Sequence, residues 1–185
     1  MASTPSARAV AQPRLDLAAL VRNVPDFPQP GIQFKDITTL IKDGEAFRYV
    51  IDHLTQTYRD STIERVVGVE SRGFIFAAPV AYHLGAGFVP VRKPGKLPWR
   101  SIKREYALEY GTNTLEVHGD AIEPGQRVLI VDDVLATGGS AAATAALVEE
   151  LGGKVVGIAV VAELTFLKGR DRLAGYEVTS LIQFG

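Results

Sequence analysis

Two adjacent carboxylates and a turn of small residues follow one strongly apolar run of the sequence. The run Val128–Val131 leads into Asp132 and Asp133, and the turn is Ala136-Thr137-Gly138-Gly139-Ser140. Backbone N–H groups at the start of a helix bind phosphate, and the hydroxyls of Thr137 and Ser140 would assist them. Carboxylates repel phosphate, so the two aspartates favour sugar hydroxyls or a divalent metal ion, bound directly or through water. The segment therefore predicts a ribose 5-phosphate site.

A structural interpretation of the same segment remains open. One aspartate could cap the following helix while the glycines only turn the chain. The paired acids favour the ligand site, because a cap requires only one of them.

A second anion loop is predicted at Glu70-Ser71-Arg72-Gly73, which separates an apolar run from a predicted helix. Backbone N–H groups and the forked guanidinium of Arg72 would suit a second phosphate group of the same ligand. An ordinary turn with a solvated Arg72 is the alternative.

A basic stretch with three interleaved proline and glycine residues follows the next apolar run. Its cations are Arg92, Lys93, Lys96, Arg100, Lys103 and Arg104, and it contains Trp99. A solvated face, or a nucleic-acid patch on which Trp99 stacks, would have the same composition. Because the stretch directly follows a predicted parallel strand, closure over a diphosphate is the better interpretation. Arg92, Lys93 and Lys96 lie closest to the strand, and Lys93 and Lys96 are the predicted diphosphate ligands.

These segments alternate with apolar runs in a way that predicts parallel βαβ units. Strands are expected at 65–69, 87–91, 127–131 and 155–161, with helices ending at Leu84 and spanning about 139–151. The strand runs are apolar on both faces, as a sheet between two helical layers requires. Ligands of such sheets bind beyond the carboxyl ends of the strands, where the predicted loops lie.

The remaining segments predict a helix, a hairpin and an irregular N-terminal part. Phe47, Val50, Ile51, Leu54 and Tyr58 form one helical face after a candidate N-cap, Asp43. A hairpin is expected from 105–110 and 114–118. A short helix is expected near 15–22, a rigid loop at 24–31 where three prolines occur, and a frayed segment at 1–14.

Composition restricts the class of protein. The chain has 185 residues, 46% hydrophobic and 22% charged, with a net charge of −1 and no cysteine. This length predicts a single domain, here residues 15–185. The absence of cysteine excludes thiolate chemistry and zinc knuckles, and the balanced charge argues against nucleic-acid and membrane binding. We expect a cytoplasmic protein.

Other nucleotide and metal motifs are absent from the sequence. It has no GxxxxGK[ST], no complete GxGxxG and no HExxH, and its three histidines lack ligand spacing.

The stretch 128–140 resembles the phosphoribosyl-binding loop of the type I phosphoribosyltransferases. The resemblance implies that Asp132 and Asp133 bind the ribose hydroxyls and that 136–140 hold the 5-phosphate. It further implies that the loop at Ser71 contacts diphosphate, with a cis non-proline peptide nearby. Mg²⁺ is expected on oxygens of the donor, 5-phosphoribosyl 1-diphosphate (PRPP), with Asp132 or Asp133 as a contact through water.

Two further segments resemble the adenine-specific members of that family. Ala107-Leu108-Glu109-Tyr110-Gly111 resembles their catalytic flap, which makes Glu109 the candidate acid/base and Tyr110 a flap contact. The segment 25–38 resembles their adenine hood, which implies that Phe34 stacks on the base and that the backbones of Gln33 and Lys35 contact it. Phe27 is interpreted as a core anchor. The segment 162–170 also matches and is interpreted as structural.

The resemblance implies a type I phosphoribosyltransferase fold: a central parallel sheet flanked by helices, with a hood at about 15–40 and a flexible flap at about 92–118. The implied reaction is Mg²⁺-dependent purine salvage, in which adenine and PRPP give AMP and diphosphate, by a homodimer. A xanthine, guanine or orotate phosphoribosyltransferase would share the phosphate loop but not the hood and flap. A purine-responsive repressor would require an additional DNA-binding domain.

Overall fold

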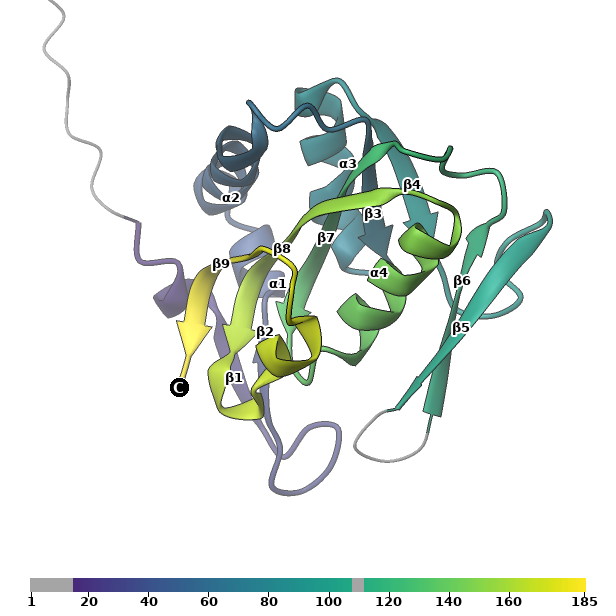
Figure 1. Cartoon of the computed structure of the whole chain (residues 1–185). Coiled ribbons are helices and arrows are strands. Elements are labelled where there is room, and N and C mark those ends of the chain that lie inside the picture. Colours follow the sequence, from purple (N-terminus) through teal and green to yellow (C-terminus); the bar gives the residue numbers. More distant parts are fainter. Residues whose placement is uncertain (1–14, 108–111) are drawn as a thin grey trace, which may run out of the picture.

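A five-stranded parallel sheet is the centre of the computed structural model, which describes residues 15–107 and 112–185 (Figure 1). Every neighbouring pair of its strands runs parallel, in the order β4-β3-β7-β8-β9. The strands are β3 (Arg65–Val69), β4 (Gly87–Val91), β7 (Arg127–Leu135), β8 (Lys154–Leu164) and β9 (Val178–Phe184). The predicted parallel α/β sheet is confirmed, and β9 is a strand that the sequence analysis did not identify.

Helices cover both faces of this sheet (Figure 1). Helices α2 (Gly44–Tyr58) and α3 (Gly73–Leu84) share one core with Leu129 and Val131, whereas α4 (Gly139–Glu150) shares the other with Val128 and Ile130. Alternate residues of β7 thus enter opposite cores, which explains why the strand is apolar on both faces. Among the described residues no helix is long and apolar enough to cross a membrane.

The predicted N-cap of α2 is confirmed. The Asp43 side chain accepts hydrogen bonds from the backbone N–H groups of Glu45 and Ala46, at 3.1 and 2.9 Å. It satisfies two N–H groups that have no partner within the helix.

The N-terminal part differs from the prediction. Instead of a helix near 15–22 there is only a 3₁₀ turn at Ala18–Leu20, and β1 (Arg22–Pro25) pairs antiparallel with β2 (Gln33–Asp36) before the short α1 (Thr38–Ile41). The prolines had indicated a loop from residue 24. Only Pro25 of these prolines lies in β1, as its last residue, and a strand edge without a partner needs no backbone donor.

A second two-stranded sheet is the predicted hairpin, formed by β5 (Ser101–Ala107) and β6 (Thr112–His118). Both strands begin earlier than the predicted residues 105 and 114, and they pair as far as Ala107 and Thr112; residues 108–111 lie outside the described part of the chain. The hairpin packs on α4, and β6 also contacts β4. Two 3₁₀ turns, η2 (Thr165–Leu167) and η3 (Gly169–Leu173), connect β8 to β9.

Strand β7 extends further than predicted. The sequence analysis ended it at Val131, but it continues to Leu135, and Asp132 lies opposite Val160 of β8. Strand β8 is extended in the same way and pairs with β7 up to Leu135 and Glu163. The ladder of backbone hydrogen bonds outweighs the low strand propensity of aspartate. The two acids therefore have backbones fixed in a strand.

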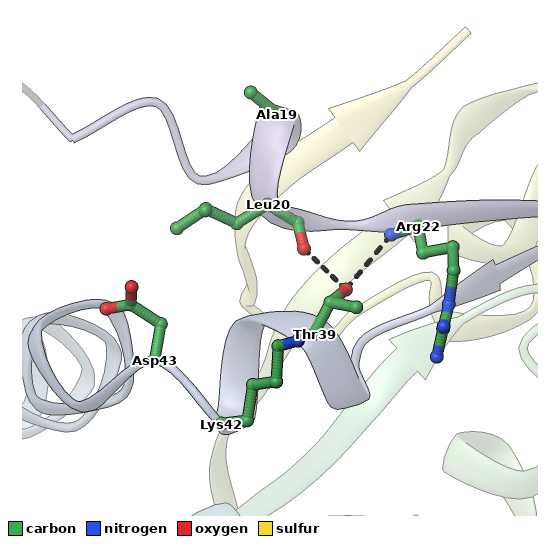
Figure 2. A pocket seen from close by; sticks show the side chains of 6 residues that line it. All are labelled: Ala19, Leu20, Arg22, Thr39, Lys42 and Asp43. Atoms are coloured by element: carbon green, nitrogen blue, oxygen red, sulfur yellow. Dashed lines mark hydrogen bonds between the residues drawn. The ribbon is translucent and has the colours of Figure 1, made fainter.

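A pocket of about 390 Å³ lies where the 3₁₀ turn, β1 and α1 meet (Figure 2). The Thr39 hydroxyl donates to the Leu20 carbonyl at 2.6 Å and accepts from the Arg22 N–H at 3.2 Å. Arg22 also forms an ion pair with Asp36 across the β1–β2 pair. These contacts join the 3₁₀ turn, β1, β2 and the start of α1 to one another within the hood.

Candidate active site

The two predicted anion loops lie side by side because they follow neighbouring strands. Strands β3 and β7 pair up to Gly68 and Val131, so the loop at Glu70–Gly73 and the turn at 136–140 leave the same edge of the sheet. Helix α3 begins directly against the acid pair, since a Cβ on Gly73 would lie 2.7 Å from Asp132 Oδ1. The Glu70–Ser71 peptide is cis, as the family resemblance implied.

Asp132 and Asp133 are both buried, with exposed fractions of 7% and 6%. Burial, together with the charge of Asp133, raises the pKa of Asp132 well above its usual value. The Asp133 N–H donates to Asp132 Oδ1 at 2.9 Å and offsets part of this cost. A buried like-charge pair favours groups that donate hydrogen bonds or carry positive charge.

Arg72 links the acid pair to the hood. Its Nε forms an ion pair with Asp133 Oδ2 at 2.6 Å. The angles of this contact do not meet the criteria for a hydrogen bond, and Asp133 Oδ2 has no hydrogen-bond partner among the described residues. The guanidinium carbon also lies 5.3 Å from the centre of the Phe34 ring. Phe34 in turn meets Phe27 edge-to-face, with 5.1 Å between ring centres. Phe27 is 51% exposed, so its interpretation as a core anchor was wrong. Residues from the hood, the loop after β3 and the end of β7 therefore converge.

The turn before α4 has the conformation that the phosphate prediction requires. Gly138 has φ +79°, a value that favours glycine, and α4 begins at Gly139. A Cβ on Gly138 would overlap the carbonyl oxygen of Gly169 in η3, so a second constraint also requires glycine here. N–H groups at a helix N-terminus have no acceptor within the helix, so those of this turn suit an anionic ligand.

Glu70 binds the first two residues of the basic stretch. Its carboxylate lies 3.2 Å from Arg92 Nε and accepts a hydrogen bond from the Lys93 N–H at 2.9 Å. Burial alone would raise the pKa of Glu70, but these partners lower it on balance. The Arg92 Nη1 also donates to the Lys96 carbonyl at 3.0 Å. The side chains of Lys93 and Lys96 are exposed.

Glu116 connects the basic stretch to the hairpin. It is 2% exposed, its Oε1 lies 2.8 Å from Lys103 Nζ, and its Oε2 accepts from the Gly95 N–H at 3.2 Å. Neither Glu70 nor Glu116 was assigned a role from the sequence. The position of Glu116 opposite Lys103 in the hairpin would have indicated that it binds a cation of the basic stretch.

The hood residues are placed on β2. The Gln33 side chain accepts from Asn23 at 2.9 Å, and Lys35 Nζ lies 4.4 Å from the centre of the Phe184 ring. The predicted contacts of the Gln33 and Lys35 backbones with the base stay a prediction. Strand β2 pairs with β1 alone among the strands in the described part of the chain. Glu109 and Tyr110 lie outside the described residues.

Comparison with known proteins identifies the family. Residues 38–182 match the model of the phosphoribosyl transferase domain. An adenine phosphoribosyltransferase of Chloroflexus aurantiacus is 63% identical over 171 residues, which cover 92% of this chain and 99% of the relative. The chain belongs to the adenine phosphoribosyltransferase family.

Solved structures of the family agree with the fold described above. An adenine phosphoribosyltransferase of Thermoanaerobacter pseudethanolicus has a TM-score of 0.88 and 54% identity, covering 91% of this chain and 98% of its own. The Saccharomyces cerevisiae family member, in complex with an imino-altritol bisphosphate and adenine, has a TM-score of 0.83 and 43% identity, covering 89% and 96%. The chain is thus a pentosyltransferase with the type I phosphoribosyltransferase fold.

Proposed function

We propose that the protein transfers the 5-phosphoribosyl group of PRPP to adenine, giving AMP and diphosphate. The observation that carries this proposal is the convergence of Arg72, Asp133 and Phe34 beside a glycine turn at the edge of the sheet. Arg72 can bind the diphosphate of PRPP, Asp133 can bind its ribose hydroxyls, and Phe34 can stack on adenine. The three side chains are close enough to contact PRPP and adenine bound next to each other.

The donor is bound by groups of opposite character. The turn at Ala136, Thr137, Gly138, Gly139 and Ser140 holds the 5-phosphate, and Asp132 and Asp133 hold the ribose hydroxyls. Ser71 and Arg72 bind the diphosphate, and Arg92, Lys93 and Lys96 complete its site when the flap closes. Asp133 now pairs with Arg72; bound ribose hydroxyls and diphosphate would separate these two groups and give each its own partner.

Adenine is read by the hood. Phe34 stacks on the base, and the backbones of Gln33 and Lys35 match the donor and acceptor pattern of its Watson–Crick edge. The yeast relative was crystallised with adenine, which supports this assignment. The free edge of β2 offers backbone groups without strand partners, as β-edge recognition requires.

Mg²⁺ fits the acid pair as an ion that the donor carries. Mg²⁺ prefers oxygen ligands and keeps several waters, and Asp133 Oδ2 is a buried carboxylate oxygen that accepts no hydrogen bond. The described residues form no group of three or more acids and histidines that could hold an ion alone. When bound, Mg²⁺ would neutralise charge on the departing diphosphate, with Asp132 or Asp133 contacting it through water.

The reaction breaks the bond between C1 and diphosphate, forms the bond from C1 to adenine, and removes a proton from the base. The transition state is oxocarbenium-like, so the acid pair orients the ribose while Arg72 and the basic stretch stabilise the leaving group. Glu109 is the proposed acceptor of the adenine proton. Closure of the flap, with Tyr110, excludes water that would otherwise hydrolyse C1.

We infer a cytoplasmic homodimer that forms through α3 and β4. Ile75, Tyr82 and Phe88 expose 39%, 82% and 38% of their surfaces there, and β4 is an edge strand. The adjoining basic stretch would then lie close to the second subunit.

The reaction is tested with purified protein, Mg²⁺, PRPP and labelled bases. We expect conversion of adenine to AMP, with hypoxanthine, guanine, xanthine and orotate used far more slowly. Equal use of hypoxanthine, or no AMP, would contradict the proposal.

Substitution of Gly138 tests the phosphate turn. Alanine at φ +79° costs about 1–2 kcal/mol and also overlaps the Gly169 carbonyl, so the turn must shift. We expect the KM for PRPP to rise about tenfold with the Kd for adenine unchanged.

The matched control is Gly125→Ala. Gly125 has φ +88° but open space around its Cα, so its substitution carries the conformational cost without the overlap. An equal rise in KM in both variants would show that Gly138 has no special role in donor binding.

A further inference from the structure

The connection from β8 to β9 lies directly beneath the phosphate turn. Gly169, the first residue of η3, is in such close contact that a Cβ on it would overlap the Ala136 carbonyl oxygen and lie 3.1 Å from the Gly138 nitrogen. Gly138 is limited by Gly169 in the same way. The two backbones therefore cannot move independently, and the place of Gly169 sets the place of the turn.

An ion pair between the buried Glu163 and the partly exposed Arg170 holds the residue next to Gly169. Arg170 donates from Nε and Nη2 to the two carboxylate oxygens of Glu163, at 2.7 and 2.8 Å, and Glu163 is 3% exposed. A forked, two-bond pair of this kind defines the orientation of both groups. Glu163 lies opposite Leu135, the last residue of β7, so the pair stands at the start of the phosphate turn.

Strand β9 completes the network. The Ser180 hydroxyl donates to Glu163 Oε2 at 2.7 Å, and Arg170 Nη1 donates to the Val178 carbonyl at 3.0 Å. The Arg170 contacts lower the pKa of Glu163, so the acid stays ionised at neutral pH. None of these side chains reaches Asp132, Asp133 or Arg72 through a hydrogen bond or ion pair that the structure describes.

We propose that Glu163 and Arg170 are positioning residues for the donor: their ion pair presses Gly169 against the Ala136 and Gly138 backbone and so aims the turn at the 5-phosphate. This inference rests on the proposed function for the identity of the ligand. It assigns to the segment 162–170, which the sequence analysis interpreted as structural only, a role in donor affinity.

The test compares steady-state kinetics of Arg170→Gln with wild type. We expect the KM for PRPP to rise about tenfold while the KM for adenine and kcat stay within about twofold, because only the turn is displaced. Arg170→Lys, which restores the charge without the fork, should recover part of the affinity.

Two additional variants keep the test decisive. Removing Arg170 alone leaves a buried, unpaired Glu163 that could prevent folding, so the double variant Glu163→Gln with Arg170→Gln is measured as well. Arg127→Gln makes the same chemical change at the opposite end of β7, where the Arg127 side chain donates to the Ser61 carbonyl, and should leave all constants unchanged.

The outcomes separate this inference from the proposed function. A wild-type protein that forms no AMP contradicts the proposed function, and calorimetric binding of AMP then tests the inference by itself. The inference is overturned if the folded double variant binds PRPP or AMP as tightly as wild type. It is also overturned if the KM values for both substrates and kcat change in parallel, which indicates a general structural defect.

Discussion

Asparagine in place of both Asp132 and Asp133 is expected to lower kcat/KM for PRPP by about a thousandfold. Each substitution removes a charged acceptor for a ribose hydroxyl, and such a hydrogen bond is worth about 1.5–3 kcal/mol. Two of them correspond to roughly three powers of ten at about 1.4 kcal/mol for each. The control replaces the exposed Asp52 and Asp60 by asparagine, which removes the same charge from the surface of α2 and the loop behind it.

Stability should change in the opposite direction for Asp132→Asn. Because burial and Asp133 raise the pKa of Asp132, its ionised form destabilises the folded state, and stability is lost as the pH rises through that pKa. The Asn variant does not pay this cost, so its advantage in free energy of unfolding should grow from pH 4 to pH 8 in denaturant titrations. A variant that lost both activity and stability would indicate that Asp132 supports the fold instead of the ligand.

Alanine at Glu109 is expected to lower kcat by about a hundredfold or more, with the Kd for PRPP changed by less than about twofold. A positioned acid/base contributes about 10²–10⁴ in rate, and it acts on the proton of adenine rather than on donor binding. Tyr106 lies near the end of the described part of β5, and burial together with the charge of Asp132 raises its pKa. The described end of β5 at Tyr106 is thus close enough to Asp132 for the two groups to interact electrostatically.

The matched control for Glu109 is Glu105→Ala, an exposed acid of β5. Pre-steady-state measurements of AMP formation would separate the chemical step from product release. An unchanged kcat in Glu109→Ala, or an equal loss in Glu105→Ala, would exclude the acid/base role.

The central sheet could be predicted because the residue patterns that define its strands and the nearby helix cap lie within short segments of the sequence. Runs such as Val128–Val131 are apolar on both faces, and the capping side chain of Asp43 lies next to the N–H groups that it binds. The acid pair and the phosphate turn are likewise contiguous in sequence. The end of β7 was misplaced because aspartate has a low strand propensity, whereas the pairing partner that extends it lies in β8.

The supporting residues could not be predicted, because their roles depend on distant partners. Glu70 binds Arg92, which is 22 positions away, and Glu116 binds the Gly95 N–H, which is 21 positions away. Gly138 and Gly169 are more distant still, and their contact exists only once β8 and η3 are in place. The residue type at one position does not indicate which distant residue it will contact.

The base-reading strand and the donor-binding strands belong to different sheets. Strand β2 pairs only with β1 in the described chain, and it is fastened through Thr39 and the Arg22–Asp36 pair, whereas the acid pair and both anion loops are built on β3 and β7. The hood is in this sense a replaceable module. Exchange of residues 22–36 for the equivalent segment of a relative with another base preference would alter which nucleotide is made while leaving the sugar-transfer chemistry intact.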